Sequence, residues 1–264
     1  MHSFLEEFYR EIGLEFKKLS WLKKQYGQHL LIDTNVLEKI LHTASPLGDI
    51  VEVGPGPGIL TLELLRHAAR SVRSFEIDHR FADSLAAISN MHTNFTSSFC
   101  DAMGVDWKNI LPGADIVSNL PYNIATPLII KWLRCYGWGR ATVMVQKEIA
   151  DRITAPVGSR LYGRLSAIVQ RHANAELLFS VPPDSFFPPP KVWSAVIRIT
   201  HKSEVSWDQI FDDGLRRIFS NPRKCIRKIL PDERWEAIGI IPGKRPCELS
   251  VEELEVLSHE IIRF

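Results

Sequence analysis

The sequence is poor in several features that mark special classes of protein. Its 264 residues include only four cysteines, which are widely scattered and form no C-x-x-C pair. No histidine lies at zinc-finger spacing, so we expect neither a metal site nor a disulfide framework. Reduced thiols of this kind are typical of a cytoplasmic protein.

Long apolar runs are also missing. No run approaches the roughly 18 apolar residues that a membrane span needs. The first 24 residues contain four glutamates and no uninterrupted apolar stretch, which is unlike a secretory signal. We therefore predict a soluble, cytoplasmic protein that makes no membrane contact.

A marked excess of charge of one sign is absent as well. Lys plus Arg number 32 and Asp plus Glu number 31, which gives a formal net charge of +1. A protein that coats nucleic acid non-specifically usually carries a larger basic excess. The balance is nevertheless compatible with a local basic face.

Strand-like and helix-like segments alternate along most of the chain. This pattern, with a spacing of roughly 20 to 25 residues, is typical of a doubly wound α/β sheet. The expected strands cover 49–53, 71–77, 94–100, 114–120, 141–146 and 193–200. The expected helices cover 35–42, 59–68, 81–89, 126–134 and 147–154.

The alternation stops near residue 201, and the rest of the chain is helical in pattern. The helical segments are WDQIFDDGLRRIFS, KCIRKIL, ERWEAIGI and VEELEVLSHEIIRF. Ser250 and Glu253 are spaced as a capping box for the last one. We predict an N-terminal extension over 1–21 with no assigned function, an α/β domain over 22–201 and a helical domain over 202–264.

A glycine-rich turn, GPGPG (54–58), joins the first expected strand to its helix. Gly54 and Gly56 allow a ligand to approach the backbone, and the following helix presents free N–H groups. The spacing is neither the G-x-G-x-x-G of NAD enzymes nor a phosphate loop. A tight turn with no ligand is the alternative explanation.

Polar residues end the next three expected strands. Glu76 follows Gly54 by 22 residues, a spacing typical of an acid that accepts hydrogen bonds from ribose hydroxyls. Asp101 and Asn119 come at the ends of the following two strands. Because open α/β sheets bind ligands at the carboxyl ends of their strands, these positions together favour a nucleoside site.

The tetrapeptide Asn119-Leu120-Pro121-Tyr122 is the most specific chemical signal. Methyl transfer to an exocyclic amine requires its lone pair to be turned out of the ring. Two acceptors can hold the amine hydrogens: the Asn119 side-chain oxygen and a backbone carbonyl that Pro121 holds outward. We assign this carbonyl to Leu120, which is therefore predicted to be catalytic. Tyr122 can stack on a flipped nucleobase. Catalysis then depends on aligning the amine with the methyl donor, and no strong proton acceptor is required. A simple turn is the alternative explanation.

These motifs resemble the ribosomal RNA adenine dimethyltransferases (the KsgA family). The matching segments are KKQYGQHLLID (23–33), VEVGPGPGILT (51–61), FEID (75–78), DA (101–102), NLPYNIATPL (119–128), VQKEIADRI (145–153), SRLYGRLSAIVQ (159–170), FFPPPKVWSAVIRI (186–199) and RPCELSVEEL (245–254). They cover most of the chain.

The resemblance implies a Rossmann-like domain that uses S-adenosylmethionine, followed by a small helical domain. The implied reaction is dimethylation at N6 of two adjacent adenosines in the 3′-terminal hairpin loop of small-subunit ribosomal RNA, during ribosome biogenesis. The implied partner is a pre-30S particle, bound by a monomer without a metal. The implied cofactor-binding residues are Gln28, His29, Leu31, Gly54, Gly56, Glu76, Asp101 and Asn119.

Phe187 is implied to be a second aromatic wall beside the target, although a core aromatic would fit its sequence context equally well. Two positions depart from the family's usual pattern. Cys100 stands where glycine is common, so it is expected to crowd a turn. Trp193 stands where aspartate is common, which leaves the role of that position open.

A block without acidic residues runs from 215 to 230 in the helical region. Its basic residues are Arg216, Arg217, Arg223, Lys224, Arg227 and Lys228. Such a block fits contacts to RNA phosphates, which position a protein without reading bases. A solvated helix face is the alternative.

Two rival functions share these motifs. One is a resistance methyltransferase acting on large-subunit ribosomal RNA, which has the same fold and a similar N-[LI]-P-Y motif. The other is a binding protein on the same fold without catalysis. The segments at 145–153, 162–166 and 186–192 favour the small-subunit enzymes, and the intact motif at 119–122 favours catalysis.

Overall fold

The computed structural model describes residues 2–15, 28–67, 69–202, 205–230 and 232–263. The chain divides into two compact units. Unit 1 comprises Met1–Lys147 and Glu176–Thr200, and unit 2 comprises Glu148–Ala175 and His201–Phe264. The predicted limit at residues 21 and 22 of the α/β domain lies outside the described residues.

A seven-stranded sheet forms the framework of the described chain, in the order β4-β3-β2-β5-β6-β9-β7. The strands are β2 (Asp49–Val53), β3 (Ser71–Glu76), β4 (Phe95–Phe99), β5 (Ala114–Asn119), β6 (Arg140–Gln146), β7 (Ala173–Val181) and β9 (Ser194–His201). The neighbours from β4 to β6 run parallel, and β9 is antiparallel to β6. This arrangement confirms the predicted α/β class.

The strand order reverses between β2 and β5, which are parallel neighbours in the sheet although β3 and β4 lie between them in the chain. Such a reversal leaves a crevice at the carboxyl ends of the two strands, because their connections leave in opposite directions. The glycine turn follows β2 there, and Asn119 ends β5.

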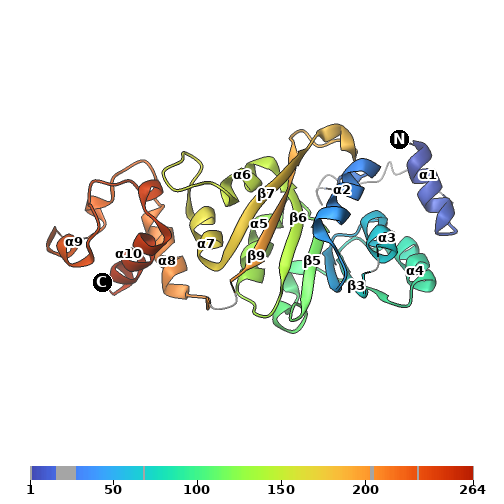
Figure 1. The fold of residues 1–264 in the computed structure, drawn as a ribbon, viewed down its shortest axis with the longest axis horizontal. Coiled ribbons are helices and arrows are strands. Elements are labelled where there is room, and N and C mark those ends of the chain that lie inside the picture. The colour runs from blue at the N-terminus through green and yellow to red at the C-terminus, as the bar shows by residue number, and fades with distance from the viewer. Residues whose placement is uncertain (1, 16–27, 68, 203–204, 231, 264) are drawn as a thin grey trace. The chain divides into compact units, whose positions relative to one another are not determined.

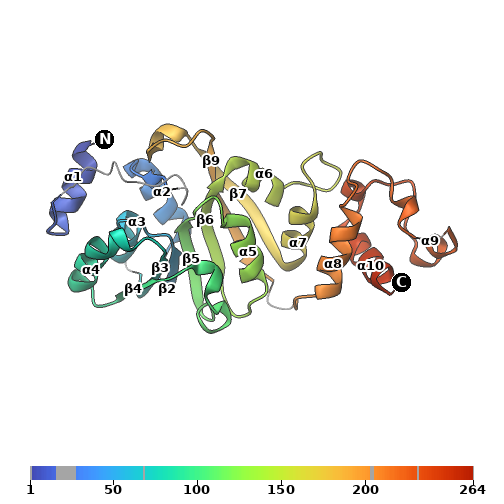
Figure 2. The same ribbon diagram turned by 180° about the vertical axis from the view of Figure 1, so that it is seen from behind.

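Helices cover both faces of the sheet (Figures 1 and 2). Those of unit 1 are α1 (His2–Glu11), α2 (Thr34–Ala44), α3 (Ile59–Arg66), α4 (Ala82–Met91) and α5 (Ala125–Leu133). Helix α2 begins where its N-cap Asp33 accepts from the main-chain N–H groups of Asn35 and Val36. It ends before Ser45, whose backbone is left-handed.

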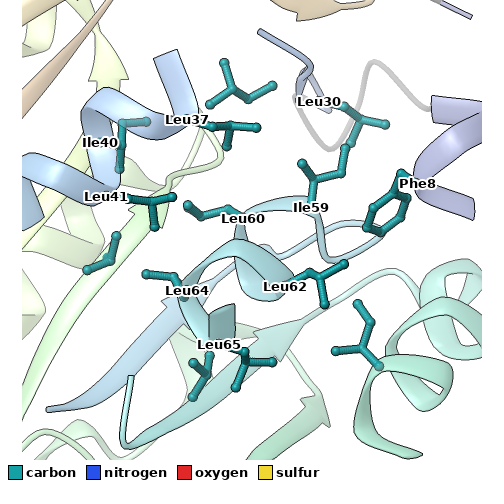
Figure 3. Close-up of a cluster of buried hydrophobic side chains, with 14 of the residues drawn as sticks. Phe8, Leu30, Leu37, Ile40, Leu41, Ile59, Leu60, Leu62, Leu64 and Leu65 are labelled. Atoms are coloured by element: carbon teal, nitrogen blue, oxygen red, sulfur yellow. The ribbon is translucent and has the colours of Figure 1, made fainter. Parts of the chain in front are cut away.

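Strand alternation separates two apolar layers. On one face, Ile50 and Val117 belong to the same cluster as the leucines of α2 and α3. Figure 3 shows these leucines. The rings of Phe75, Trp107 and Trp132 form another buried group, with edge-to-face contacts at 5.0 and 5.8 Å between centroids.

The amphipathic N-terminal helix α1 also belongs to this core. Leu5, Phe8 and Ile12 are buried in the cluster that contains Ile59 of α3, and Figure 3 shows Phe8 beside Ile59. An ion pair joins Glu11 to Arg66. Each buried side chain contributes about 1.5–3 kcal/mol. The extension therefore stabilises unit 1, a role that the sequence alone did not assign.

A short second sheet joins distant parts of the chain. Strand β1 (Leu30–Leu31) pairs antiparallel with β8 (Phe186–Phe187), placing Leu30 opposite Phe187 and Leu31 opposite Phe186. The pairing brings the segment before α2 together with the segment before the proline triplet. Neither strand was expected from the sequence.

Unit 2 contains the remaining α-helices of the described chain: α6 (Lys147–Ile153, from its second residue), α7 (Arg164–His172), α8 (Gln209–Ile218), α9 (Asp232–Ile238) and α10 (Val251–Ile262). Helices α8 and α10 lie side by side in both views (Figures 1 and 2). Ser250 and Glu253 form the predicted capping box at the start of α10.

Unit 2 differs from the predicted helical region in two respects. It includes residues 148–175, which the sequence pattern assigned to the α/β domain, because α7 packs against α8 and α10. The expected helix over 224–230 is not formed, and the segment contains a single 3₁₀ turn at Ile226–Lys228.

Other short 3₁₀ turns are η2 (His79–Phe81), η3 (Ala102–Gly104), η4 (Trp107–Asn109), η5 (Pro183–Ser185) and η7 (Pro246–Glu248). Within the described ranges, the chain has no helix long and apolar enough to cross a membrane.

Candidate active site

A cavity of about 310 Å³ lies in unit 1 at the carboxyl ends of β2 and β5. Its size is at the lower end of the range for small-molecule sites. The predicted site residues that line it are Gln28, His29, Leu31, Gly54, Gly56, Glu76, Asp101, Asn119, Leu120 and Tyr122. The fold thus brings together residues that are spread over almost a hundred positions of sequence.

The glycine turn touches the tetrapeptide that ends β5. Gly54 has a φ of +69°, and its N–H donates to the Phe75 carbonyl at 2.8 Å. A Cβ atom built on Gly54 would lie 2.9 Å from Cγ of Pro121. Glycine is needed here because both the backbone angle and the close approach exclude a side chain.

Glu76 is buried at the end of β3 and is held by three main-chain donors. Its Oε2 accepts from Gly56 at 2.9 Å, and its Oε1 accepts from Ile77 at 2.9 Å and from Asp78 at 2.8 Å. Burial raises the pKa of Glu76, although these hydrogen bonds act to lower it. A carboxylate has about four lone-pair positions, so one stays available for a ligand hydroxyl.

Gln28 is positioned by the acid two residues beyond Glu76. Its Nε2 donates to Oδ2 of Asp78 at 2.6 Å. Burial acts to raise the pKa of Asp78, but hydrogen bonds from Arg80 and Gln28 lower it to about 2. The Asp78 carboxylate is therefore charged at neutral pH and fixes the Gln28 amide at the edge of the cavity.

Asp101 caps the turn after β4, where its Oδ1 accepts from the N–H of Met103 at 2.8 Å. The side chain is exposed and borders the cavity beside Ile77, an apolar residue with 46% of its surface exposed. An apolar wall next to a carboxylate suits a purine ring that carries an amine. Cys100 does not have a positive φ, so the backbone at this position does not require glycine, and side-chain crowding there stays a prediction.

Asn119 has a defined orientation at the junction of the cavity and the target side. Its Nδ2 donates to the main-chain carbonyl of His29 at 3.1 Å. The amide oxygen is thereby left to accept from a substrate amine. The Leu120 side chain is buried, and its N–H donates to the Met144 carbonyl at 3.1 Å, so its contribution to a ligand comes from its own carbonyl.

Tyr122 forms an aromatic wall with fixed neighbours. Its ring stacks on His29 with centroids 5.6 Å apart and an interplanar angle of 26°. Its hydroxyl shares a 2.6 Å hydrogen bond with the hydroxyl of Ser194. Burial raises the pKa of Tyr122, so the phenol stays neutral at physiological pH.

Phe187 comes close to this wall through the β1–β8 pairing. It lies opposite Leu30 in the ladder, and the carbonyl of the next residue, Pro188, is 2.7 Å from Nδ1 of His29. Phe187 is only partly buried. It packs against the hydrophobic core cluster and does not line the cavity, so its role as an aromatic wall stays a prediction.

Sequence reasoning missed two serines that hold the site together. Ser194 anchors Tyr122 from the start of β9. Ser118 joins the ends of β5 and β2: its hydroxyl accepts from the Val53 N–H at 3.3 Å and donates to the Val53 carbonyl at 2.6 Å. A hydroxyl residue within the otherwise apolar run ADIV-S-N was the available signal for Ser118.

Glu52 is a fully buried acid beneath the cavity. Its Oε2 accepts from the Thr61 hydroxyl at 2.6 Å. Burial raises its pKa to about 8, against the lowering effect of the Thr61 hydrogen bond, and the nearby Glu76 adds to the increase. Glu52 is therefore largely protonated at neutral pH.

We expect the protonation of Glu52 to make stability depend on pH. Between the ordinary carboxyl pKa and about 8, the folded chain keeps a proton that the unfolded chain has lost. The free energy of unfolding therefore falls by about 1.4 kcal/mol per pH unit in this window and levels off above it. Glu52→Gln should remove this decrease and be the more stable form at pH 9.

Urea unfolding of wild type and Glu52→Gln between pH 5 and 9 measures the effect. Glu38→Gln, on the exposed side of α2, is the control and should follow wild type. If the free energy of unfolding changes with pH in the same way for wild type and Glu52→Gln, Glu52 is not protonated in the folded chain at neutral pH.

The six basic residues of the block belong to unit 2, and all six side chains are exposed. Arg216 is 3.1 Å from Asp212, and Arg217 donates to the Ile261 carbonyl at 3.1 Å. Within the described chain, no ion pair is found for Arg223, Lys224, Arg227 or Lys228. Two of these, Lys224 and Lys228, line a surface hollow with Arg217.

One group of possible metal ligands is found in unit 2. Oxygen or nitrogen atoms of Asp208, Glu255 and His259 lie within 4.8 Å of one another. Arg171 is 2.7 Å from Glu255 and 3.6 Å from Asp208, so a guanidinium already balances these acids. The absence of a metal site stays a prediction.

Comparisons with known proteins agree with this geometry. The sequence model of a family described as "Ribosomal RNA adenine dimethylase" matches residues 20–240. A protein of Phenylobacterium zucineum (strain HLK1) named Ribosomal RNA small subunit methyltransferase A is 42% identical over 238 residues, which are 86% of this chain and 82% of that protein. Its namesake in Alcanivorax borkumensis (strain ATCC 700651 / DSM 11573 / NCIMB 13689 / SK2) is 37% identical, over 90% of this chain and 89% of that protein.

Two solved structures share the fold over most of their length. A dimethyladenosine transferase from Plasmodium falciparum superposes with a TM-score of 0.78 at 26% identity, covering 89% of this chain and 98% of that one. The 23S rRNA methyltransferase ErmE superposes with a TM-score of 0.69 at 27% identity, covering 88% and 99%. The fold alone therefore does not separate the two substrate classes. The methyl donor of such enzymes is S-adenosylmethionine.

Proposed function

Because this chain belongs to the ribosomal RNA adenine dimethylase family, we propose that it dimethylates two adjacent adenosines in the 3′-terminal hairpin loop of small-subunit ribosomal RNA. The observation that carries the proposal is the orientation of Asn119, whose Nδ2 is engaged by His29 so that its oxygen faces a substrate amine. The higher identity of relatives named as small-subunit enzymes favours this substrate over 23S RNA.

The cavity residues fit S-adenosylmethionine. Glu76 has a lone pair available for a ribose hydroxyl, and Asp101 beside Ile77 offers an acceptor and an apolar wall for the adenine. Gly54 and Gly56 leave space at the turn where side chains would intrude. Gln28, His29 and Leu31 close the cavity from the N-terminal side. When bound, this cofactor supplies a methyl group on a positively charged sulfur.

The protein's own residues orient the target amine. Before the first transfer, the Asn119 oxygen and the Leu120 carbonyl accept the two N6 hydrogens, which turns the nitrogen lone pair out of the adenine plane. Before the second transfer, one N6 hydrogen remains and one of these oxygens accepts it. After each transfer the methylated nitrogen releases one proton to solvent. Tyr122 and Phe187 hold the flipped base by stacking. Alignment of the amine with the methyl donor lowers the barrier. The two oxygen acceptors lower it further, because they stabilise the positive charge that develops on nitrogen.

A methyl-transfer assay on unmethylated 30S subunits and on 23S RNA tests the proposal. Mass spectrometry of the 30S product should find N6,N6-dimethyladenosine at two adjacent positions near the 3′ end. Transfer only to 23S RNA would favour the rival resistance activity, and no transfer to either would favour a binding protein without catalysis.

The basic block is proposed to contact RNA phosphates. The four side chains at 223, 224, 227 and 228 are proposed to make most of these phosphate contacts, because Arg216 already forms an ion pair with Asp212. Changing all four to alanine should weaken binding to 30S subunits and make log Kd less dependent on log salt concentration, by roughly 0.7–0.9 for each phosphate that is no longer neutralised. Filter binding at several salt concentrations measures both.

Arg216→Ala is the matched control for the four-residue variant. It removes one exposed charge from the same block, yet one that already has an acidic partner, so we expect a smaller change in the salt slope. If log Kd depends equally on log salt concentration in wild type and the four-residue variant, the block is a solvated helix face that does not bind RNA.

We assign the catalytic domain to residues 22–201 and the RNA-contacting helical domain to 202–264. The helical domain matches the second part of unit 2, which begins at His201. We propose that the enzyme works as a monomer in the cytoplasm on a pre-30S particle during ribosome biogenesis.

A further inference from the structure

The residue that precedes the Tyr122 anchor in the chain is an exposed aromatic that the reaction described above does not use. Trp193 lies directly before Ser194, the residue that anchors Tyr122, and 51% of its surface is exposed. Of the other described tryptophans, those at 107, 132, 138 and 235 are buried and Trp207 is partly buried. Large exposed aromatic side chains are typical of binding surfaces, because they offer much contact area with little loss of conformational freedom.

The backbone at Trp193 is fixed on both sides. Its carbonyl accepts from the N–H of Lys147 at 2.9 Å, and the next residue, Ser194, pairs with Gln146 at the start of the β6–β9 ladder. Ser194 is fully buried, and its hydroxyl is 2.6 Å from that of Tyr122. Consecutive Cα atoms are about 3.8 Å apart, so Trp193 is held near the aromatic wall.

The surroundings of Trp193 favour a nucleobase as its partner. Lys191 and Val192, the two residues before it in the chain, are exposed as well, so this segment offers a cation, an apolar side chain and an indole to solvent. Flipping one adenosine out of a loop also unstacks its neighbours, and unpaired bases stack readily on aromatic side chains. Lys191 can meet the phosphate of the same nucleotide.

We propose that Trp193 is a stacking platform for an unpaired nucleotide that flanks the target adenosine in the RNA. The inference rests on the proposed function for the identity of the RNA. Trp193 acts as a positioning residue: it holds the strand so that the flipped base enters between Tyr122 and Phe187. It thus contributes to RNA affinity far more than to the methyl-transfer step.

Three variants test this role: Trp193→Ala, Trp193→Phe and Tyr136→Ala. Tyr136 is the matched control, because it is an aromatic residue with the same 51% exposure, between α5 and β6 at the other end of that strand. With unmethylated 30S subunits, Trp193→Ala should raise KM for RNA roughly 10-fold with kcat within about threefold. Trp193→Phe should keep most of the affinity, and Tyr136→Ala should match wild type.

A second measurement separates stacking from a structural effect. Kd is measured for hairpin RNAs in which each nucleotide flanking the adenosine pair is made abasic in turn. One abasic position should weaken wild-type binding roughly 10-fold, yet change the Kd of Trp193→Ala by less than about twofold. Calorimetric affinity for S-adenosylmethionine should be equal in all variants.

Two outcomes would overturn the inference: RNA KM and Kd for Trp193→Ala within about twofold of wild type, or no abasic position that distinguishes the two proteins. A failure of the proposed function is visible separately, as wild-type protein that binds the RNA but transfers no methyl group. The abasic comparison still decides the role of Trp193 in that case.

Discussion

Asn119→Ala is expected to lower kcat for methyl transfer by about 10²–10³ or more, while the Kd for RNA stays within about threefold of wild type. The substitution removes the oxygen that accepts from the target amine and also the Nδ2 donor to His29. The surfaces that stack and bind phosphate are unchanged. Single-turnover transfer to unmethylated 30S subunits, together with filter binding, measures the two quantities independently.

Asn109→Ala is the control for this experiment. Asn109 is an exposed asparagine of η4 whose Nδ2 bonds to Asp106 and which does not line the cavity. Its replacement should leave kcat unchanged. A kcat for Asn119→Ala within tenfold of wild type would refute the assigned role.

Gly54→Ala should impair cofactor binding and catalysis together, by about 10²-fold in kcat/KM. A Cβ at residue 54 would lie 2.9 Å from Cγ of Pro121, so the turn or the 119–122 segment must shift. A misplacement of about 1 Å can cost such a factor. The φ of +69° adds strain of roughly 1–2 kcal/mol to the folded state.

Gly113→Ala separates strain from collision. Gly113 has a similar φ of +79°, but a Cβ built on it meets no atom within 4 Å. Both variants should lose similar stability in urea unfolding, and only Gly54→Ala should lose affinity for S-adenosylmethionine. Loss of affinity in both would mean that general destabilisation, and not the contact with Pro121, explains the effect.

The sequence predicted six of the seven strands of the sheet because those six have a local apolar pattern, and it did not predict β7. Short apolar runs such as 49–53 and 141–146 are bounded by turns and helices, and the observed strands agree within about two residues. The residues that line the cavity were predictable for the same reason. Glu76, Asp101 and Asn119 lie at strand ends, and the carboxyl ends of parallel strands share one edge.

The target side of the site was less predictable, since it depends on contacts between distant segments. Strands β1 and β8 have two residues each, too few for any periodicity. The contact between His29 and Pro188 spans 159 positions, and no local pattern links Ser194 to Tyr122. The resemblance to a known family pointed to Phe187, but not to the pairing that positions it.

Errors in the helical region had a different cause. The residues of 224–230 have helical spacing, yet only one 3₁₀ turn forms among them. The pattern also could not assign residues 148–175 to unit 2, because that depends on packing of α7 against α8 and α10.

The β1–β8 pairing has a consequence for the order in which the enzyme becomes active during its own synthesis. A nascent chain leaves the ribosome N-terminus first, so every predicted cofactor residue emerges well before Phe187 and Ser194. A chain that stops short of residue 186 has the glycine turn and Asn119, but no partner for β1 and no anchor for Tyr122. The chain must therefore extend through Ser194 before the target side of the site can form.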